Sequence, residues 1–115
     1  MNPAGETAAL FVYGSLLDRG LRERLLGRAV STSPTGLPDY ERRRGRHYYV
    51  VKRDGARTDG FLLEGLGPSD FELLDRYEDV PRLYVREQVG VIDEHGASRG
   101  CWLYLPAAQL LSDPD

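Results

Sequence analysis

Apolar and polar residues follow one another along the chain at spacings that separate strands from helices. Residues 8–13 form an apolar run that predicts a first strand, and leucines recur at helical spacing over residues 18–28. Residues 31–40 are rich in turn-forming residues and predict a loop. Short extended segments are expected at residues 40–44 and 47–53, after which an Asp-Gly pair predicts a tight turn.

The second half of the chain is rich in β-branched and aromatic residues, with one amphipathic helix among them. Residues 58–66 predict a further strand. The pattern then changes to helical spacing over residues 69–79, where Ser69 and Glu72 form a capping-box sequence. Two strands joined by a short turn are predicted over residues 82–106, and the C-terminal tail can hold a short helix.

These elements predict an α+β fold, built as a small, mostly antiparallel β-barrel with flanking helices. The pattern contains about six or seven strands and two helices. Residues 1–7 are expected to form a flexible N-terminal tail, and residues 8–110 a single domain without internal repeats. A chain of 115 residues, of which 41% are hydrophobic, is long enough to bury one core.

Composition and charge exclude several classes of protein. The net charge of −3 argues against generic nucleic-acid binding. No apolar run reaches membrane-spanning length and the N-terminus lacks the blocks of a signal peptide, so a cytoplasmic protein without a membrane partner is expected. Cys101 is the single cysteine, which excludes an intrachain disulfide and a thiolate zinc site. His47 and His95 are too few for a metal cluster.

Glu78 is a carboxyl group on the apolar side of the helix predicted over residues 69–79. At about 100° per residue it shares a face with Phe71 and Leu74. Partial burial, the negative end of the helix dipole and the neighbouring Asp79 would all raise its pKa, which suits a group that exchanges protons near neutral pH. The alternative is a frayed helix end at which Glu78 pairs with an arginine. The arginines within reach are Arg76, Arg82 and Arg86.

The sequence Tyr13-Gly14-Ser15-Leu16 stands where the first predicted strand gives way to a helix. Gly14 lets the backbone approach a ligand, and the amides after it can bind a carboxylate or stabilise an oxyanion. Ser15 and Asp18 form a Ser-x-x-Asp capping sequence for the helix. The alternative is an ordinary strand-to-helix turn with a capping serine.

Two other groups are candidates for binding an anion. Tyr84 and Arg86 fall on one face of a predicted strand, where they can hold an anionic substrate or simply line a solvated face. The basic run at residues 41–47 can contact phosphates or an acidic partner, but such a run is more often a solvated loop or edge strand.

Four segments carry a resemblance to a known family: FVYGSL, TDGFLLEGL, LDRYEDVPRLYVRE and CWLYL. In this order they resemble the γ-glutamylcyclotransferase-like superfamily, which includes the AIG2-like proteins and the γ-glutamylamine cyclotransferases. The resemblance runs from about Leu10 to Tyr104. It implies a small β-barrel flanked by helices, with a cavity that holds a γ-glutamyl group.

By this resemblance Glu78 matches the catalytic acid/base, in agreement with its unusual place on the helix. The positions that match substrate-binding residues are Tyr13, Gly14, Ser15, Leu16, Tyr84 and Arg86. Gly60 matches the glycine that opens the central strand. The chain departs from many members at Asp79, where they have glycine, and at residues 48–50, where they have a proline.

The resemblance implies an enzyme without a metal or organic cofactor, acting on a small γ-glutamyl substrate to release 5-oxoproline and an amine. The leaving amine is left open among those of glutathione, γ-glutamyl dipeptides, γ-glutamyl-ε-lysine and γ-glutamylamines, and both a monomer and a homodimer are expected states. One alternative is a non-catalytic module that binds a small acidic metabolite. Others are an enzyme that removes a γ-glutamyl protecting group and an interaction protein that uses residues 41–47.

Overall fold

The described part of the chain contains five β-strands, three α-helices and one 3₁₀ turn. The computed structural model describes residues 7–112. The elements are β1 (Ala8–Val12), η2 (Ser15–Leu17), α1 (Arg19–Leu26), β2 (Ser31–Arg44), β3 (Tyr48–Leu66), α2 (Pro68–Tyr77), β4 (Tyr84–Asp93), β5 (Ser98–Pro106) and α3 (Ala108–Ser112). The tail predicted at residues 1–7 lies, except for Thr7, outside the described residues.

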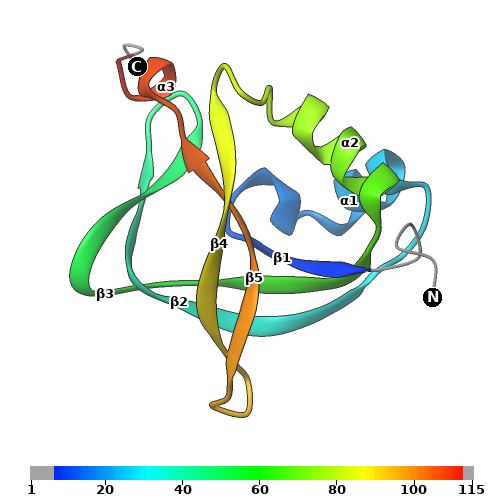
Figure 1. Ribbon diagram of the computed structural model, residues 1–115, viewed down its shortest axis with the longest axis horizontal. Coiled ribbons are helices and arrows are strands. Elements are labelled where there is room, and N and C mark those ends of the chain that lie inside the picture. Colours follow the sequence, from blue (N-terminus) through cyan, green and yellow to red (C-terminus); the bar gives the residue numbers. More distant parts are fainter. Residues whose placement is uncertain (1–6, 113–115) are drawn as a thin grey trace.

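The five strands close into a barrel in the order β1-β3-β2-β4-β5 (Figure 1). β1 runs parallel to β5, with Leu10 opposite Trp102, while the other described pairs are antiparallel. β2 also pairs with β4, where Thr35 lies opposite Asp93. The prediction of an α+β fold with a small, mostly antiparallel barrel and flanking helices is confirmed.

Alternation along β1 divides the buried residues into two clusters. Phe11 joins a cluster that draws residues from all five strands, among them Leu103. Leu10 and Val12 belong instead to a cluster that includes helix residues such as Leu74. Figure 1 shows α1 and α2 together on one side of the barrel, near β1. Each face of β1 is therefore buried, which explains its continuous apolar sequence.

Residues 31–40, predicted to be a loop, form the first part of β2 instead. Their backbone pairs with β3 from Ser31 to Pro38, because pairing with a neighbouring strand overrides local turn propensity. The predicted Asp-Gly turn is also wrong. Gly55, at φ 83°, lies in an irregular part of the continuous strand β3, where its amide donates to Asp39 Oδ1 at 2.9 Å. Short predicted strands therefore merge, and the described chain has five strands rather than six or seven.

The helix predicted from Ser69 begins one residue earlier, at Pro68, and has a different cap. The Asp70 carboxylate accepts a hydrogen bond from the Gly67 amide at 2.8 Å. Arg28 donates to both oxygens of the same carboxylate, at 2.6 and 2.8 Å. This contact ties the start of α2 to the segment after α1. The short helix predicted in the C-terminal tail is present as α3.

Gly60 lies where β3 passes close to the end of β1. A Cβ atom there would lie 2.1 Å from the Val12 carbonyl oxygen and 2.8 Å from Phe11 Cζ. We expect Gly60→Ala to lower the free energy of unfolding by about 3 kcal/mol, measured by urea denaturation, because the barrel would have to move to admit the methyl group. Gly90→Ala is the control, since a Cβ at Gly90 meets no atom within 4 Å. Equal effects of the two substitutions would contradict the close approach.

Candidate active site

A cavity of about 430 Å³ lies between the end of β1, the η2 turn, the β2–β3 hairpin and the end of α2. Its lining residues are Phe11, Val12, Tyr13, Gly14, Ser15, Leu16, Arg44, Arg46, His47, Tyr48, Tyr77, Glu78, Leu83, Tyr84 and Tyr104. The set includes every predicted site residue except Arg86. The fold thus brings the loop at residues 13–16 to Glu78, which lies more than sixty residues further along the chain.

Residues 13–16, which we call the 13–16 loop, are held at their C-terminal end by backbone hydrogen bonds of the 3₁₀ turn. The Leu17 amide donates to the Gly14 carbonyl oxygen at 2.9 Å, and the Asp18 amide to the Ser15 carbonyl oxygen at 3.1 Å. The amides of Ser15 and Leu16 come before these bonds, so they have no acceptor within the 3₁₀ turn. These are the amides on which the hypothesis of an anion-binding loop depends.

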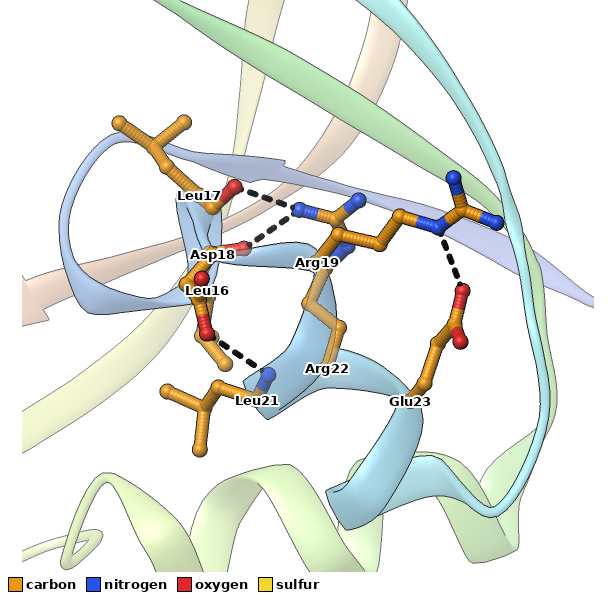
Figure 2. Close-up of polar contacts among 7 residues, drawn as sticks. All are labelled: Leu16, Leu17, Asp18, Arg19, Leu21, Arg22 and Glu23. Carbon is orange, nitrogen blue, oxygen red and sulfur yellow. Dashed lines mark hydrogen bonds and ion pairs between the residues drawn. The ribbon is translucent and has the colours of Figure 1, made fainter.

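Side chains of Ser15 and Asp18 contact the helices α2 and α1, respectively. The Ser15 hydroxyl shares a hydrogen bond of 2.9 Å with the Tyr77 hydroxyl at the end of α2. The predicted cap of α1 is supplied by Asp18 alone, whose carboxylate accepts from the Leu21 amide at 2.8 Å (Figure 2). Ser15 is therefore part of the cavity wall rather than a helix cap.

Arg22 is a buried arginine on α1 whose guanidinium group points back to the end of the η2 turn (Figure 2). Its Nη1 atom donates to the carbonyl oxygens of Leu16 and Leu17, at 3.0 and 2.8 Å. These carbonyl groups end the short helix and would otherwise lack partners within it. Arg22 thus holds the 13–16 loop in place, a role that no motif in the sequence indicates.

We expect Arg22→Met to lower the free energy of unfolding by about 1.5–3 kcal/mol, because two backbone carbonyl groups lose a charged donor. The matched control is Arg19→Met, since Arg19 is exposed and pairs with Glu23 on the same helix. An exposed pair of this kind contributes little to stability, because solvent screens it. Urea denaturation of the two variants measures the difference. Similar losses in the free energy of unfolding would contradict the role of Arg22.

Glu78 follows the last residue of α2 and lines the cavity. Its amide donates to the Leu74 carbonyl oxygen at 2.9 Å, so its backbone still belongs to the last helical turn. Asp79 then adopts a left-handed φ of 58°, and the Val80 amide donates to the Asp75 carbonyl oxygen at 2.9 Å. Glycine adopts this φ with the least strain, so the departure at Asp79 falls where the backbone itself favours glycine.

The Glu78 carboxyl group forms no hydrogen bond or ion pair with the residues that the structure describes. Burial raises its pKa from 4.5 to about 7. The alternative of an ion pair at the helix end is not realised among the described residues. Arg82 pairs with Asp79, Arg86 pairs with Asp75, and within residues 7–112 no ion pair joins Arg76 to Glu78. Both the protonated and the ionised form of Glu78 are therefore populated near neutral pH.

Three tyrosines in the cavity wall have hydroxyl groups that donate to other parts of the protein. Tyr13 donates to the Tyr104 carbonyl oxygen at 2.7 Å, Tyr84 to the Tyr48 carbonyl oxygen, and Tyr104 to Asp75 Oδ1 at 2.7 Å. Burial is the main cause that raises the pKa of all three phenols well above the ordinary value. They remain neutral and shape the wall of the cavity.

Arg86 lies behind the cavity wall rather than in it. Its guanidinium group donates to both Asp75 carboxylate oxygens, at 2.9 and 3.1 Å. It also lies 4.5 Å from the ring centroids of Phe71 and Trp102. The same Asp75 carboxylate accepts from Tyr104, so Arg86 supports the wall. The structure does not bring it to the substrate position that the sequence predicts for it.

One wall of the cavity is formed by the β2–β3 hairpin, whose two arginines the sequence does not assign to the site. Arg44, Arg46, His47 and Tyr48 line the cavity from this hairpin. The run at residues 41–47 is predicted from its composition to be a solvated segment, or else a contact for phosphates or an acidic partner. No local pattern indicates its true place, because the hairpin meets the 13–16 loop through contacts between segments far apart in the sequence, such as that of Arg42 Nη1 with the Tyr13 carbonyl oxygen.

Within residues 7–112, no group of three or more His, Cys, Asp or Glu side chains is placed to hold a metal ion. None of the helices in this range is long and apolar enough to cross a membrane.

A closed, mixed barrel of five strands with three helices defines the γ-glutamylcyclotransferase-like class of fold. A solved structure from Arabidopsis thaliana matches it with a TM-score of 0.80 at 26% sequence identity, covering 95% of this chain and 73% of that one. A second solved structure, named gamma-glutamyl cyclotransferase, matches with a TM-score of 0.79 at 20% identity, covering 89% of this chain and 68% of its own.

Sequence comparison leads to the same group. The family model described as gamma-glutamyl cyclotransferase, AIG2-like, matches residues 10–114. AIG2-like protein D of Arabidopsis thaliana is 34% identical over 87 residues, which cover 73% of this chain and 56% of that protein. This chain therefore belongs to the AIG2-like gamma-glutamyl cyclotransferase family. It spans about half the length of the curated relatives it matches.

Proposed function

We propose that this protein is a γ-glutamyl cyclotransferase in which Glu78 is the general acid/base. The observation that carries the proposal is the Glu78 carboxyl group, which lies in the cavity without a hydrogen-bond partner among the described residues and has a pKa of about 7. Membership of the family supports the same activity. A carboxyl group placed only for stability would have an arginine or amide partner.

The proposed reaction is an intramolecular aminolysis of a γ-glutamyl amide. The α-amino nitrogen of the glutamyl unit attacks its own side-chain amide carbon, a five-membered lactam forms as the C–N bond to the partner breaks, and 5-oxoproline and an amine result. Both reacting groups belong to one molecule, so the cavity has to fold the substrate into the reactive shape. Orientation of this kind can supply up to about 7–11 kcal/mol.

Glu78 would move the proton between the two nitrogen atoms. As a carboxylate it takes a proton from the attacking nitrogen, and as a carboxylic acid it returns that proton to the leaving nitrogen. Proton transfer by a placed group contributes about 10²–10⁴-fold to the rate. A pKa of about 7 makes both steps accessible at neutral pH. The proton count is balanced over one turnover.

The 13–16 loop would receive the charged end of the substrate. The amides of Gly14, Ser15 and Leu16 are suited to the α-carboxylate or to the developing oxyanion. Tyr13 and Tyr84 would form the side walls that hold the glutamyl chain, because both line the cavity with neutral rings. Arg86 has a supporting part in this proposal, through Asp75, and no contact with substrate.

A mass-spectrometric assay for 5-oxoproline tests the proposal. The protein is incubated with glutathione, γ-glutamyl dipeptides, γ-glutamyl-ε-lysine and γ-glutamylamines. We expect stoichiometric release of 5-oxoproline and the free amine from at least one of them, which also identifies the leaving group. Binding of these compounds without release would support the non-catalytic module instead.

The remaining sequence-based hypotheses stay predictions. These are the extent of the single domain at residues 8–110, a cytoplasmic location, activity without a cofactor, and a monomeric or homodimeric state.

A further inference from the structure

Asp75 is a half-buried carboxylate in the last turn of α2, three residues before Glu78. Its Oδ1 atom accepts from Arg86 Nε at 2.9 Å and from the Tyr104 hydroxyl group at 2.7 Å, and its Oδ2 atom accepts from Arg86 Nη2 at 3.1 Å. Arg86 belongs to β4 and Tyr104 to β5. One side chain therefore joins the end of α2 to two strands of the barrel.

These hydrogen bonds define the place of the helix end more closely than its apolar contacts do. Phe71 and Leu74 pack into the core, but apolar contacts have no preferred direction. A bidentate pair of arginine and carboxylate, in contrast, has a defined geometry. Arg86 is itself held, since its guanidinium carbon lies 4.5 Å from the ring centroids of Phe71 and Trp102. The C-terminal end of α2 is therefore fixed on the barrel through Asp75.

The position of Glu78 depends closely on that of Asp75. Side chains three residues apart on a helix are neighbours, with about 5–6 Å between their Cβ atoms. The Val80 amide donates to the Asp75 carbonyl oxygen at 2.9 Å, so the turn at Asp79 that follows Glu78 is joined to Asp75 as well. A shift of Asp75 relative to the barrel would therefore move the Glu78 carboxyl group with it.

Tyr104 connects the same contact to the 13–16 loop. Its hydroxyl group donates to Asp75, while its backbone carbonyl oxygen accepts from the Tyr13 hydroxyl group at 2.7 Å. Tyr13 begins the loop whose amides are proposed to receive the substrate. Asp75 thus joins the helix that carries Glu78 to a residue that also contacts this loop.

Asp75 is unsuited to a direct part in proton transfer, because it is not among the described residues that line the cavity and both of its oxygens already accept hydrogen bonds. We propose that Asp75 is a positioning residue, which through Arg86 and Tyr104 holds the Glu78 carboxyl group within proton-transfer distance of the substrate. This inference rests on the proposed function. A general acid/base works only within about 2.6–3.2 Å of the atom that it serves, so a small shift of the helix end is costly.

Asp75→Asn tests this role. Asparagine keeps the size of the side chain, but its amide nitrogen cannot accept a hydrogen bond from Arg86. We expect kcat for 5-oxoproline release to fall about tenfold to 100-fold, because misplacement of a reacting group by about 1 Å can cost that much. KM should change by less than about threefold, since the 13–16 loop keeps its own contacts with the barrel.

Asp70→Asn is the matched control on the same helix. Asp70 also binds an arginine, Arg28, through both oxygens, but it lies at the start of α2 and is not among the described residues that line the cavity. Its variant should keep kcat within about twofold of wild type, when both variants are assayed at a temperature at which they are folded. Equal losses of kcat in the two variants would show a general effect of loosening α2 and would overturn the positioning role.

A double variant with Glu78→Gln shows whether Asp75 acts through Glu78. Effects of residues that act as a unit are not additive, so adding Asp75→Asn to Glu78→Gln should lower kcat by no more than about twofold to threefold further. A further fall as large as that caused by Asp75→Asn alone would mean that Asp75 acts on another part of the site, and the proposal would be wrong.

Amide hydrogen exchange gives a readout that does not need activity. The Glu78 and Val80 amides donate to the last turn of α2, and they should exchange at least about tenfold faster in Asp75→Asn but at close to the wild-type rate in Asp70→Asn. If the wild type releases no 5-oxoproline, the proposed function fails, and this exchange pattern alone upholds or overturns the hold of Asp75 on Glu78. If 5-oxoproline forms and the pattern is absent, the cyclotransferase stands and the positioning role is wrong.

Discussion

Substitution of Glu78 by glutamine should lower kcat/KM for 5-oxoproline release by about 10²–10⁴-fold on every substrate that the wild type cleaves. Glutamine keeps the size and shape of the side chain but cannot take up and return the proton. Burial raises the Glu78 pKa to about 7, so the wild-type carboxyl group can both accept and donate a proton near neutral pH, which the glutamine amide cannot. Mass spectrometry of 5-oxoproline measures the loss at saturating and at low substrate concentration.

The control for this substitution is Glu72→Gln on the same helix. Glu72 is exposed, and it does not line the cavity that contains Glu78. Its variant should keep wild-type activity, and both variants should bind substrate with nearly unchanged affinity. An active Glu78→Gln enzyme would show that another group transfers the proton. The wall tyrosines Tyr13, Tyr84 and Tyr104 are poor candidates, because their hydroxyl groups already donate to the protein.

Glu78→Gln should also make the protein more stable than the wild type at pH 8, by about 2–3 kcal/mol in the free energy of unfolding. The pKa of Glu78 is raised by burial from 4.5 to about 7, so the folded state holds the proton more strongly than the unfolded chain. This contribution to stability is complete below pH 4.5 and is lost as pH rises through 7. Glutamine, which has no charge to bury, escapes the loss.

Urea denaturation at pH 4 and at pH 8 measures this linkage. The difference in the free energy of unfolding between Glu78→Gln and wild type should be close to zero at pH 4 and largest at pH 8. Glu72→Gln should change stability by less than about 0.5 kcal/mol at either pH, as is usual for exposed positions. A difference for Glu78→Gln that does not vary with pH would mean that the carboxyl group is ionised equally in the folded and unfolded chain.

Glu78 could be singled out from the sequence because its anomaly is local. Helical spacing alone puts it on the apolar face with Phe71 and Leu74, and both of those residues are buried. Of the three causes expected to raise its pKa, burial is the one that the structure bears out. The Asp79 carboxylate turns toward Arg82, with 2.6 Å between Oδ2 and Nε. Local pattern therefore predicted the raised pKa of Glu78, but only one of the three causes that were expected to raise it.

Local sequence patterns could not predict the residues whose positions depend on contacts with distant segments of the chain. Residues 31–40 have the composition of a loop, yet they form strand β2 because β3 offers a continuous partner. Arg44, the last residue of the same strand, lines the cavity. Arg86 has the spacing of a pocket residue but lies one layer behind, where Asp75 binds it. Arg22 was not indicated at all, because its acceptors are backbone carbonyl groups, which leave no mark in a sequence.

The Glu78 carboxyl group, which has no hydrogen-bond or ion-pair partner within residues 7–112, also helps to decide between an enzyme and a binding module. A module for small acids gains nothing from a half-buried carboxylate, which repels an anionic ligand and lowers stability above pH 7. Proteins retain such a cost mainly where function depends on it. Backbone amides such as those of the 13–16 loop are suited to an anionic ligand without help from a carboxylate. Glu78 is the residue that a binding module would not need.

The pH dependence of kcat/KM for 5-oxoproline release, measured from pH 5 to pH 8, tests the central claim most directly. We expect the rate to rise with pH about a midpoint near 7, because Glu78 must be ionised to take the first proton. The residual activity of Glu78→Gln should lack this midpoint. Activity that is flat across this range, or a midpoint that persists in Glu78→Gln, would contradict the assignment of Glu78 as the general acid/base.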